Sequence, residues 1–60
     1  MKTVEFYGEL HCETDNALLV FDGAEKIWIP KSQIIDQYHV KGVDYEFVIT
    51  EWIAKQKGII

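Results

Sequence analysis

The sequence contains no arginine, and its six positive charges are all lysines. Ten acidic residues outnumber them, so the formal net charge at pH 7 is −4. Tight, sequence-independent binding to duplex DNA depends on many phosphate contacts from lysine and arginine. The charge balance therefore argues against such binding by a single chain, while leaving room for a local lysine face within an oligomer.

Cysteines and long apolar runs are also scarce. The single cysteine, Cys12, excludes an intrachain disulfide, and no Cys/His cluster offers a structural zinc site. No apolar run approaches transmembrane length, and the amino terminus lacks the apolar stretch of a signal peptide. A free cysteine without an export signal indicates the cytoplasm. We expect no membrane association.

Hydrophobic residues, in contrast, are plentiful, at 48% of 60 residues. A domain of this size buries only about 60% of the surface that its unfolded chain exposes, and usually needs a disulfide, a metal or a partner subunit. The segment 17–21 is apolar at every position, so neither of its faces suits water. We therefore expect a homo-oligomer, a dimer or tetramer, whose interface includes either Leu18 and Val20 or Leu19 and Phe21.

Alternation of apolar and polar residues predicts a small antiparallel sheet. The first strand places one apolar row on a single face: Val4, Phe6, Gly8, Leu10 and Cys12. Within this row Gly8 marks a bend, and Cys12 is expected to be an ordinary buried thiol. Further strands are predicted for 17–21, 26–30, 34–40 and 43–49, with turn residues between them.

The pattern changes at Thr50, which is a good helix N-cap. About two helical turns follow, and Gly58 is a natural terminator. So short a helix is unstable alone, so Trp52 and Ile53 are expected to dock it on the sheet. The whole chain is thus predicted to be one domain, mostly β (a small α+β fold), with four to five curved antiparallel strands followed by one short C-terminal helix.

The corner that follows Pro30 is the segment most typical of a binding site. An ammonium, a hydroxyl and an amide stand there on three consecutive positions, after a strand that exposes a tryptophan. Tyrosine and tryptophan on mixed faces suit base stacking or a protein interface, and the lysines suit phosphate. The alternative for the lysines is a solubilising role. The candidate residues for nucleic-acid or partner binding are Lys26, Trp28, Lys31, Ser32, Gln33, Lys41 and Tyr7.

Three side chains on the polar face of the first predicted strand form a candidate metal site: Glu9, His11 and Glu13. Oxygen-rich ligand sets suit magnesium or manganese. Alternation alone would produce the same row as a solvated outer face. Both interpretations stay open at this stage, and no other cofactor is indicated.

Three blocks of the sequence carry a resemblance to known proteins: E-T-D-N-A-L-L-V at 13–20, W-I-P-K-S-Q-I at 28–34 and E-W-I-A-K-Q-K-G at 51–58. In this order they resemble a class of very small phage and prophage proteins, mostly without an assigned function. The middle block is the most specific of the three. The class often has proline before the Glu-Trp pair, where this chain has Thr50.

The expected strands and terminal helix are also similar to the positive-cofactor-four type of single-stranded-DNA-binding fold. A phage-borne anti-CRISPR protein of comparable size resembles that fold group, forms oligomers and is associated with nicking supercoiled DNA. This resemblance implies an acidic catalytic residue near the first turn, where Asp15 is the nearest candidate.

Two functional hypotheses follow. The first is a phage- or prophage-type accessory protein, of the anti-defence or anti-CRISPR kind, that acts on or near DNA by weak metal-assisted nicking, with Glu9, Glu13 and Asp15 around the cation. The alternative is a non-enzymatic acidic protein that binds and inhibits a host nucleic-acid-binding factor. Lysine geometry discriminates between them: if Lys26, Lys31 and Lys41 of neighbouring subunits line one groove, DNA binding is favoured, and if they scatter, the inhibitor is favoured.

Overall fold

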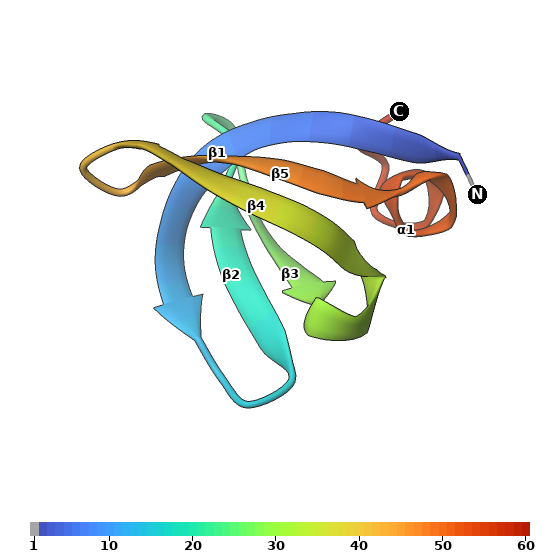
Figure 1. Ribbon diagram of the computed structural model, residues 1–60, viewed down its shortest axis with the longest axis horizontal. Helices are drawn as coiled ribbons and strands as arrows, with labels where there is room; N and C mark the ends of the chain where they lie inside the picture. Colours follow the sequence, from blue (N-terminus) through green and yellow to red (C-terminus); the bar gives the residue numbers. More distant parts are fainter. Residues whose placement is uncertain (1) are drawn as a thin grey trace.

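The computed structural model describes residues 2–60 and contains five antiparallel strands in one open sheet, followed by one short C-terminal helix (Figure 1). This confirms the predicted fold class. The elements, in chain order, are β1 (Thr3–Glu13), β2 (Ala17–Phe21), β3 (Lys26–Pro30), the 3-10 turn η1 (Lys31–Gln33), β4 (Ile34–Lys41), β5 (Asp44–Thr50) and α1 (Glu51–Gln56).

The long strand β1 joins the two halves of the sheet, whose order is β3-β2-β1-β5-β4. Its first part, from Thr3 to Glu9, pairs with β5, and its last part, from Glu9 to Glu13, pairs with β2. Figure 1 shows β1 strongly curved along this path. Glycine is needed at position 8, because a Cβ there would lie 2.4 Å from Cγ1 of Val20 and 3.0 Å from the carbonyl oxygen of Phe21.

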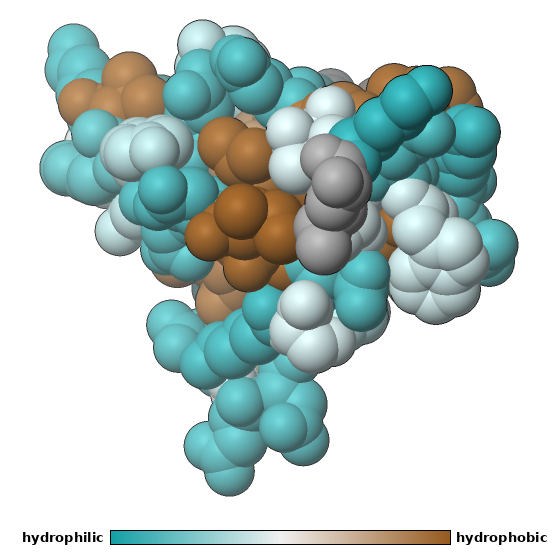
Figure 2. Space-filling model, turned by 45° about the vertical axis from the view of Figure 1, so that its right-hand side comes forward, coloured by the Kyte–Doolittle hydropathy of each residue, from teal (hydrophilic) through white to brown (hydrophobic). Residues whose placement is uncertain are grey.

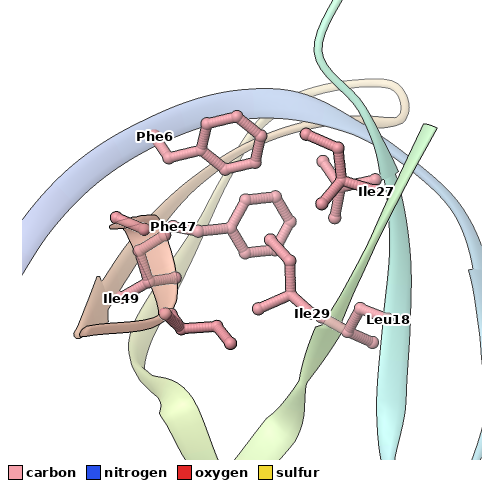
Figure 3. Packing of buried hydrophobic residues seen from close by; sticks show 9 residues of the cluster. Phe6, Leu18, Ile27, Ile29, Phe47 and Ile49 are labelled. Carbon is pink, nitrogen blue, oxygen red and sulfur yellow. The ribbon is translucent and has the colours of Figure 1, made fainter. Parts of the chain in front are cut away.

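The core lies on the concave inner face of the curved sheet, where side chains from both halves meet (Figure 3). The rings of Phe6 and Phe47 are 6.2 Å apart, and Ile27 and Ile29 of β3 approach them from the other half. Each fully buried side chain of this size stabilises the fold by about 1.5–3 kcal/mol relative to exposure. The buried members are Phe6, Leu18, Val20, Ile27, Ile29, Phe47, Ile49, Ile53 and Ala54.

Helix α1 begins at the predicted N-cap. The hydroxyl of Thr50 accepts a hydrogen bond from the Ile53 N–H at 3.2 Å and donates one to Oε1 of Gln33 at 2.7 Å. Gly58 follows the helix in the left-handed region, with φ of 72°. Within residues 2–60 no helix has the length and apolar character needed to cross a membrane.

The expected role of Trp52 is wrong. Ile53 and Ala54 are the side chains that α1 buries, whereas Trp52 is 59% exposed. Residues 52, 53 and 54 are spaced about 100° apart around the helix, so an inward side centred on Ile53 and Ala54 leaves Trp52 pointing away from the sheet. The branched Ile53 fits beneath the helix, and the indole remains on its outer surface.

A bulge in β1 changes the side-chain alternation near the end of the strand. The register runs Leu10 opposite Val20 and then Cys12 opposite Leu19, so His11 is an extra residue. From Cys12 onward, inward and outward positions are therefore exchanged. Cys12 is exposed on the outer face, and the prediction of a buried thiol is wrong.

Candidate functional site

The outer face of β1, β5 and β4 carries a set of carboxylates and tyrosines in adjacent rows. Tyr7, Glu46 and Tyr38 are directly opposite one another across the three strands, and the next row holds Glu5, Val48 and Asp36. Directly paired residues project from the same face of a sheet. We call this surface the acidic tyrosine face and define it as Glu5, Tyr7, Asp36, Tyr38, Asp44 and Glu46.

The side chain of Tyr7 is 65% exposed and that of Tyr38 is 51% exposed. Both phenols nevertheless interact with carboxylates. The hydroxyl of Tyr38 donates to Oδ2 of Asp36 at 2.7 Å, and this bond, together with the negative charge of Asp36, raises the pKa of Tyr38. Glu46 raises the pKa of Tyr7 in the same way, first by hydrogen bonding and then by its charge. Both phenols are therefore neutral hydrogen-bond donors at physiological pH.

Negative charge on this face is not balanced by ion pairs. Salt bridges in the described part of the chain, residues 2–60, join His11 to Glu9 at 2.9 Å, Lys31 to Glu13 at 2.6 Å and Lys55 to Glu51 at 3.4 Å. None of them involves a carboxylate of the acidic tyrosine face. Lys41 lies opposite Asp44 at the end of the β4–β5 hairpin, but it makes no salt bridge within residues 2–60. The face therefore carries excess negative charge.

A shallow hollow of about 350 Å³ borders the acidic tyrosine face where the two halves of the sheet meet. Its lining includes Tyr7, Glu9 and Asp44 on one side and Phe21 on the other. Two carboxylates beside aromatic and aliphatic carbon match the ammonium or guanidinium end and the methylene stem of a long basic side chain.

The lysines predicted to face phosphate lie on different parts of the chain. Lys26 begins the edge strand β3, Lys41 ends the opposite edge strand β4, and Lys31 is bound to Glu13 at 2.6 Å. Because one of the three is already paired and the others occupy opposite edges of the sheet, they do not form one lysine set within a single chain.

The remaining residues of the predicted corner have separate surroundings. Gln33 accepts the hydrogen bond from Thr50 and so links η1 to the start of α1. Ser32 is exposed on η1. Trp28 is 44% exposed and stands opposite Leu19 on the outer face of the other half of the sheet. The corner that the sequence singled out is thus linked to the end of β1 through Lys31 and to the start of α1 through Gln33.

The expectation that Glu9, His11 and Glu13 share one face is wrong, because the bulge at His11 separates them. His11 Nε2 lies 2.9 Å from Oε1 of Glu9, whereas Glu13 points to the inward side and binds Lys31. Among residues 2–60 no group of three or more His, Cys, Asp or Glu side chains is arranged to hold a metal ion. The magnesium or manganese site stays a prediction without support from side-chain geometry.

Asp15 lies in the exposed β1–β2 turn, outside the acidic tyrosine face. Figure 1 shows this turn at the lower end of the molecule, and Figure 2 shows hydrophilic side chains covering that end. An exposed turn surrounds a carboxylate with water, which weakens electrostatic interactions compared with an enclosed site. The catalytic role of Asp15 remains a prediction.

Sequence reasoning assigned only Tyr7 of the acidic tyrosine face to a site. Glu5, Asp44 and Glu46 do fall on the polar side of the predicted alternation. What links them is the pairing of β5 with β4 and with β1, and the second of these joins residues far apart in the chain, such as Tyr7 and Glu46. The polar alternation in each strand therefore indicated which residues face outward. It did not indicate which of them lie side by side, because that depends on the register of the folded sheet.

Comparison with known proteins gave no match to a protein-family model, to a curated protein or to a solved structure.

Proposed function

We propose that the protein is a non-enzymatic binding protein whose acidic tyrosine face contacts the basic, nucleic-acid-binding surface of a partner protein. The main observation in support of this proposal is a set of four carboxylates that make no salt bridge within residues 2–60: Glu5, Asp36, Asp44 and Glu46. A patch of one sign attracts a complementary patch and speeds the encounter of the two proteins.

Charge alone provides little contact area for binding. Tyr7 and Tyr38 add rigid contact area at a small cost in conformational entropy. Tyrosine is enriched among the residues that dominate binding energy, and the phenol of Tyr38 is already oriented by its hydrogen bond to Asp36. The hollow beside Tyr7 and Asp44 would accept one lysine or arginine of the partner. By covering a surface that otherwise holds nucleic acid, the protein would act as an inhibitor near DNA.

The setting of this activity belongs to the same proposal. We place the protein among phage- or prophage-type accessory proteins of the anti-defence kind, acting in the cytoplasm of the host cell on a host protein. The exposed free thiol of Cys12 is compatible with a reducing compartment. A homo-oligomer would repeat the acidic tyrosine face and increase the apparent affinity for an extended basic partner.

A competition experiment tests the proposal. A labelled DNA oligonucleotide is bound to a short peptide of alternating lysine and arginine, and the protein is titrated in. We expect the acidic tyrosine face to bind the peptide and so release the DNA. The fraction of DNA released should decrease as the salt concentration is raised. The variant Glu5→Gln/Glu46→Gln should compete about three- to tenfold less well, on the scale of two partly exposed charge pairs.

The matched control is Asp15→Asn/Glu25→Gln, which removes the same charge from exposed turns outside this face. The control should compete as well as the parent. If both double variants lose competition equally, net charge alone is responsible, and the acidic tyrosine face is not the binding site. Amide resonances of a labelled sample would locate the contact: shifts centred on β1, β5 and β4 support the proposal.

A further inference from the structure

The outer face of the other half of the sheet is apolar. Ala17, Leu19 and Phe21 of β2 point outward there, with Trp28 of β3 on one side of Leu19 and Cys12 of β1 on the other. We call these five residues the β2–β3 outer face. Leu18 and Val20, the alternative interface pair, are 2% and 0% exposed and belong to the core.

The open edge of β3 is closed to further strand pairing by Pro30. The N–H of Lys31 donates to Asn16 and that of Asp22 to Glu25, so the odd-numbered residues of β3 direct their backbone groups to β2. The backbone groups of Lys26, Trp28 and Pro30 therefore point to the open edge. Since proline has no N–H, another strand would meet an incomplete ladder there.

The opposite edge, β4, is protected by a carboxylate. The N–H of Leu10 donates to Val43, so the odd residues of β5 bond β1 and the even ones face β4. The backbone of Gln37, opposite Phe47, consequently points outward. Oδ1 of Asp36 accepts its N–H at 2.9 Å and occupies that donor. Pro30 and the occupied N–H of Gln37 each interrupt a possible ladder at one edge, which favours contact through the face of the sheet.

The charges around the β2–β3 outer face are arranged to complement themselves. Phe21 is paired with Lys26 on the β3 side and with Glu9 on the β1 side, so the three form one lateral row. A two-fold axis parallel to β2 exchanges the two sides of this row. Lys26 of one copy then meets Glu9 of the other, and the reverse pair forms by symmetry. Oε1 of Glu9 already lies 2.9 Å from Nε2 of His11, whose ring is 5.6 Å from that of Phe21, so Lys26 joins this carboxylate as a second partner.

We propose that a second copy of this chain covers the β2–β3 outer face, in a dimer whose two-fold axis runs parallel to β2. Phe21 and Leu19 pack near the axis, Trp28 lies over Cys12 of the other copy, and the two Lys26–Glu9 pairs flank the apolar centre. Stacked sheets lie about 10 Å apart, which is the room that interleaved side chains of this size need.

This arrangement does not depend on the proposed function. The six residues of the acidic tyrosine face lie on β1, β5 and β4 and remain uncovered in the dimer, whereas the neighbouring hollow shares Glu9 and Phe21 with the interface and becomes partly covered. The dimer could fail while binding to the basic peptide persists, or the reverse. Association and peptide competition therefore test separate statements.

Sedimentation equilibrium measures the dimer directly. The purified parent should be a dimer, and Leu19→Lys should shift it to monomer while circular dichroism shows an unchanged fold. Val48→Lys is the matched control, because Val48 is also half-buried on the outer face but lies in the other half of the sheet. A parent that is monomeric at every attainable concentration overturns the proposal, as does a dimer that only Val48→Lys disrupts.

A charge exchange tests the orientation of the axis. Lys26→Glu and Glu9→Lys should each weaken dimerisation by about tenfold, because each places like charges opposite one another twice. The double variant Lys26→Glu/Glu9→Lys should return to within about threefold of the parent. Additive weakening in the double variant would exclude this geometry. A monomeric Trp52→Phe variant whose remaining tryptophan fluorescence, from Trp28, responds to single-stranded oligothymidine would instead make this face a base-stacking surface and overturn the dimer.

Discussion

The two halves of the outer face are built on the same strand, yet they differ in chemistry. The half formed with β5 and β4 presents carboxylates and tyrosines, and the half formed with β2 and β3 presents Leu19, Phe21 and Trp28. Strand β1 contributes Glu5 and Tyr7 to the first. Charge and apolar surface are thus separated along one continuous sheet.

The difference shows how a chain of 60 residues divides a limited surface. One sheet with one short helix buries only its inner face, so the outer face of every strand is available for partners. The bulge at His11 turns Cys12 outward beside Leu19 and turns Glu13 away towards Lys31. Without this extra residue Glu13 would lie in the apolar half, and the separation of the two surfaces would be lost.

Both halves depend on a shared core, and the largest expected effect is on that core. Ile53→Ala removes a 3% exposed side chain that ties α1 to the sheet and should lower the free energy of unfolding by about 2–5 kcal/mol. Trp52→Ala is the control and should cost about 1 kcal/mol or less, because the indole is mostly exposed. Urea unfolding followed by circular dichroism measures both. Equal losses would show that the indole packs as tightly as Ile53.

The junction of the two halves is the next most sensitive point. Gly8→Ala places a Cβ against the buried Val20 and should destabilise the protein by about 1–3 kcal/mol, as overpacking does. Combining it with Val20→Ala provides the control, since the smaller residue makes room. The double variant should lose clearly less stability than the sum of the two single losses. Simple additivity would mean that the strands separate without strain.

Much of the inner face could be predicted because it depends on local alternation. The rows Val4, Phe6, Leu10 and Tyr45, Phe47, Ile49 point inward as expected, and Thr50 and Gly58 bound the helix. Each of these features depends on residues close together in the chain. Periodicity and capping describe such features well.

The candidate sites were less predictable because they depend on register and docking. Nothing local to His11 indicates a bulge, which arises where β1 leaves β5 for β2. Glu13 and Lys31 are 18 positions apart in the sequence. Their salt bridge joins the corner after Pro30 to the end of β1, and composition does not predict this contact. Trp52 and Ile53 are both apolar neighbours, and only the docked helix distinguishes the buried one from the exposed one.

The nicking hypothesis yields a prediction at the exposed β1–β2 turn, outside both surfaces. If Asp15 is catalytic, Asp15→Ala should abolish metal-dependent nicking of supercoiled plasmid while changing stability by about 1 kcal/mol or less. Glu25→Ala, in another exposed turn, is the matched control and should nick like the parent. A parent that never nicks plasmid, with or without added magnesium or manganese, excludes the enzyme hypothesis and leaves protein binding.

The smallest expected effect is on the titration of the two exposed tyrosines in the acidic half of the outer face. Carboxylates hold the phenolic pKa values of Tyr7 and Tyr38 above the usual value of about 10. Because the folded chain keeps these protons longer, the associated stability is complete below that pH and is lost as the pH rises through the folded values. The phenols are exposed, so the loss of stability should be slight, and ring resonances in an NMR titration are the suitable measurement.

Glu46→Gln should lower the pKa of Tyr7 and change that of Tyr38 less, because Asp36 is the main partner of Tyr38. Equal shifts of both tyrosines would indicate a diffuse field over the whole acidic face in place of two separate hydrogen-bonded pairs.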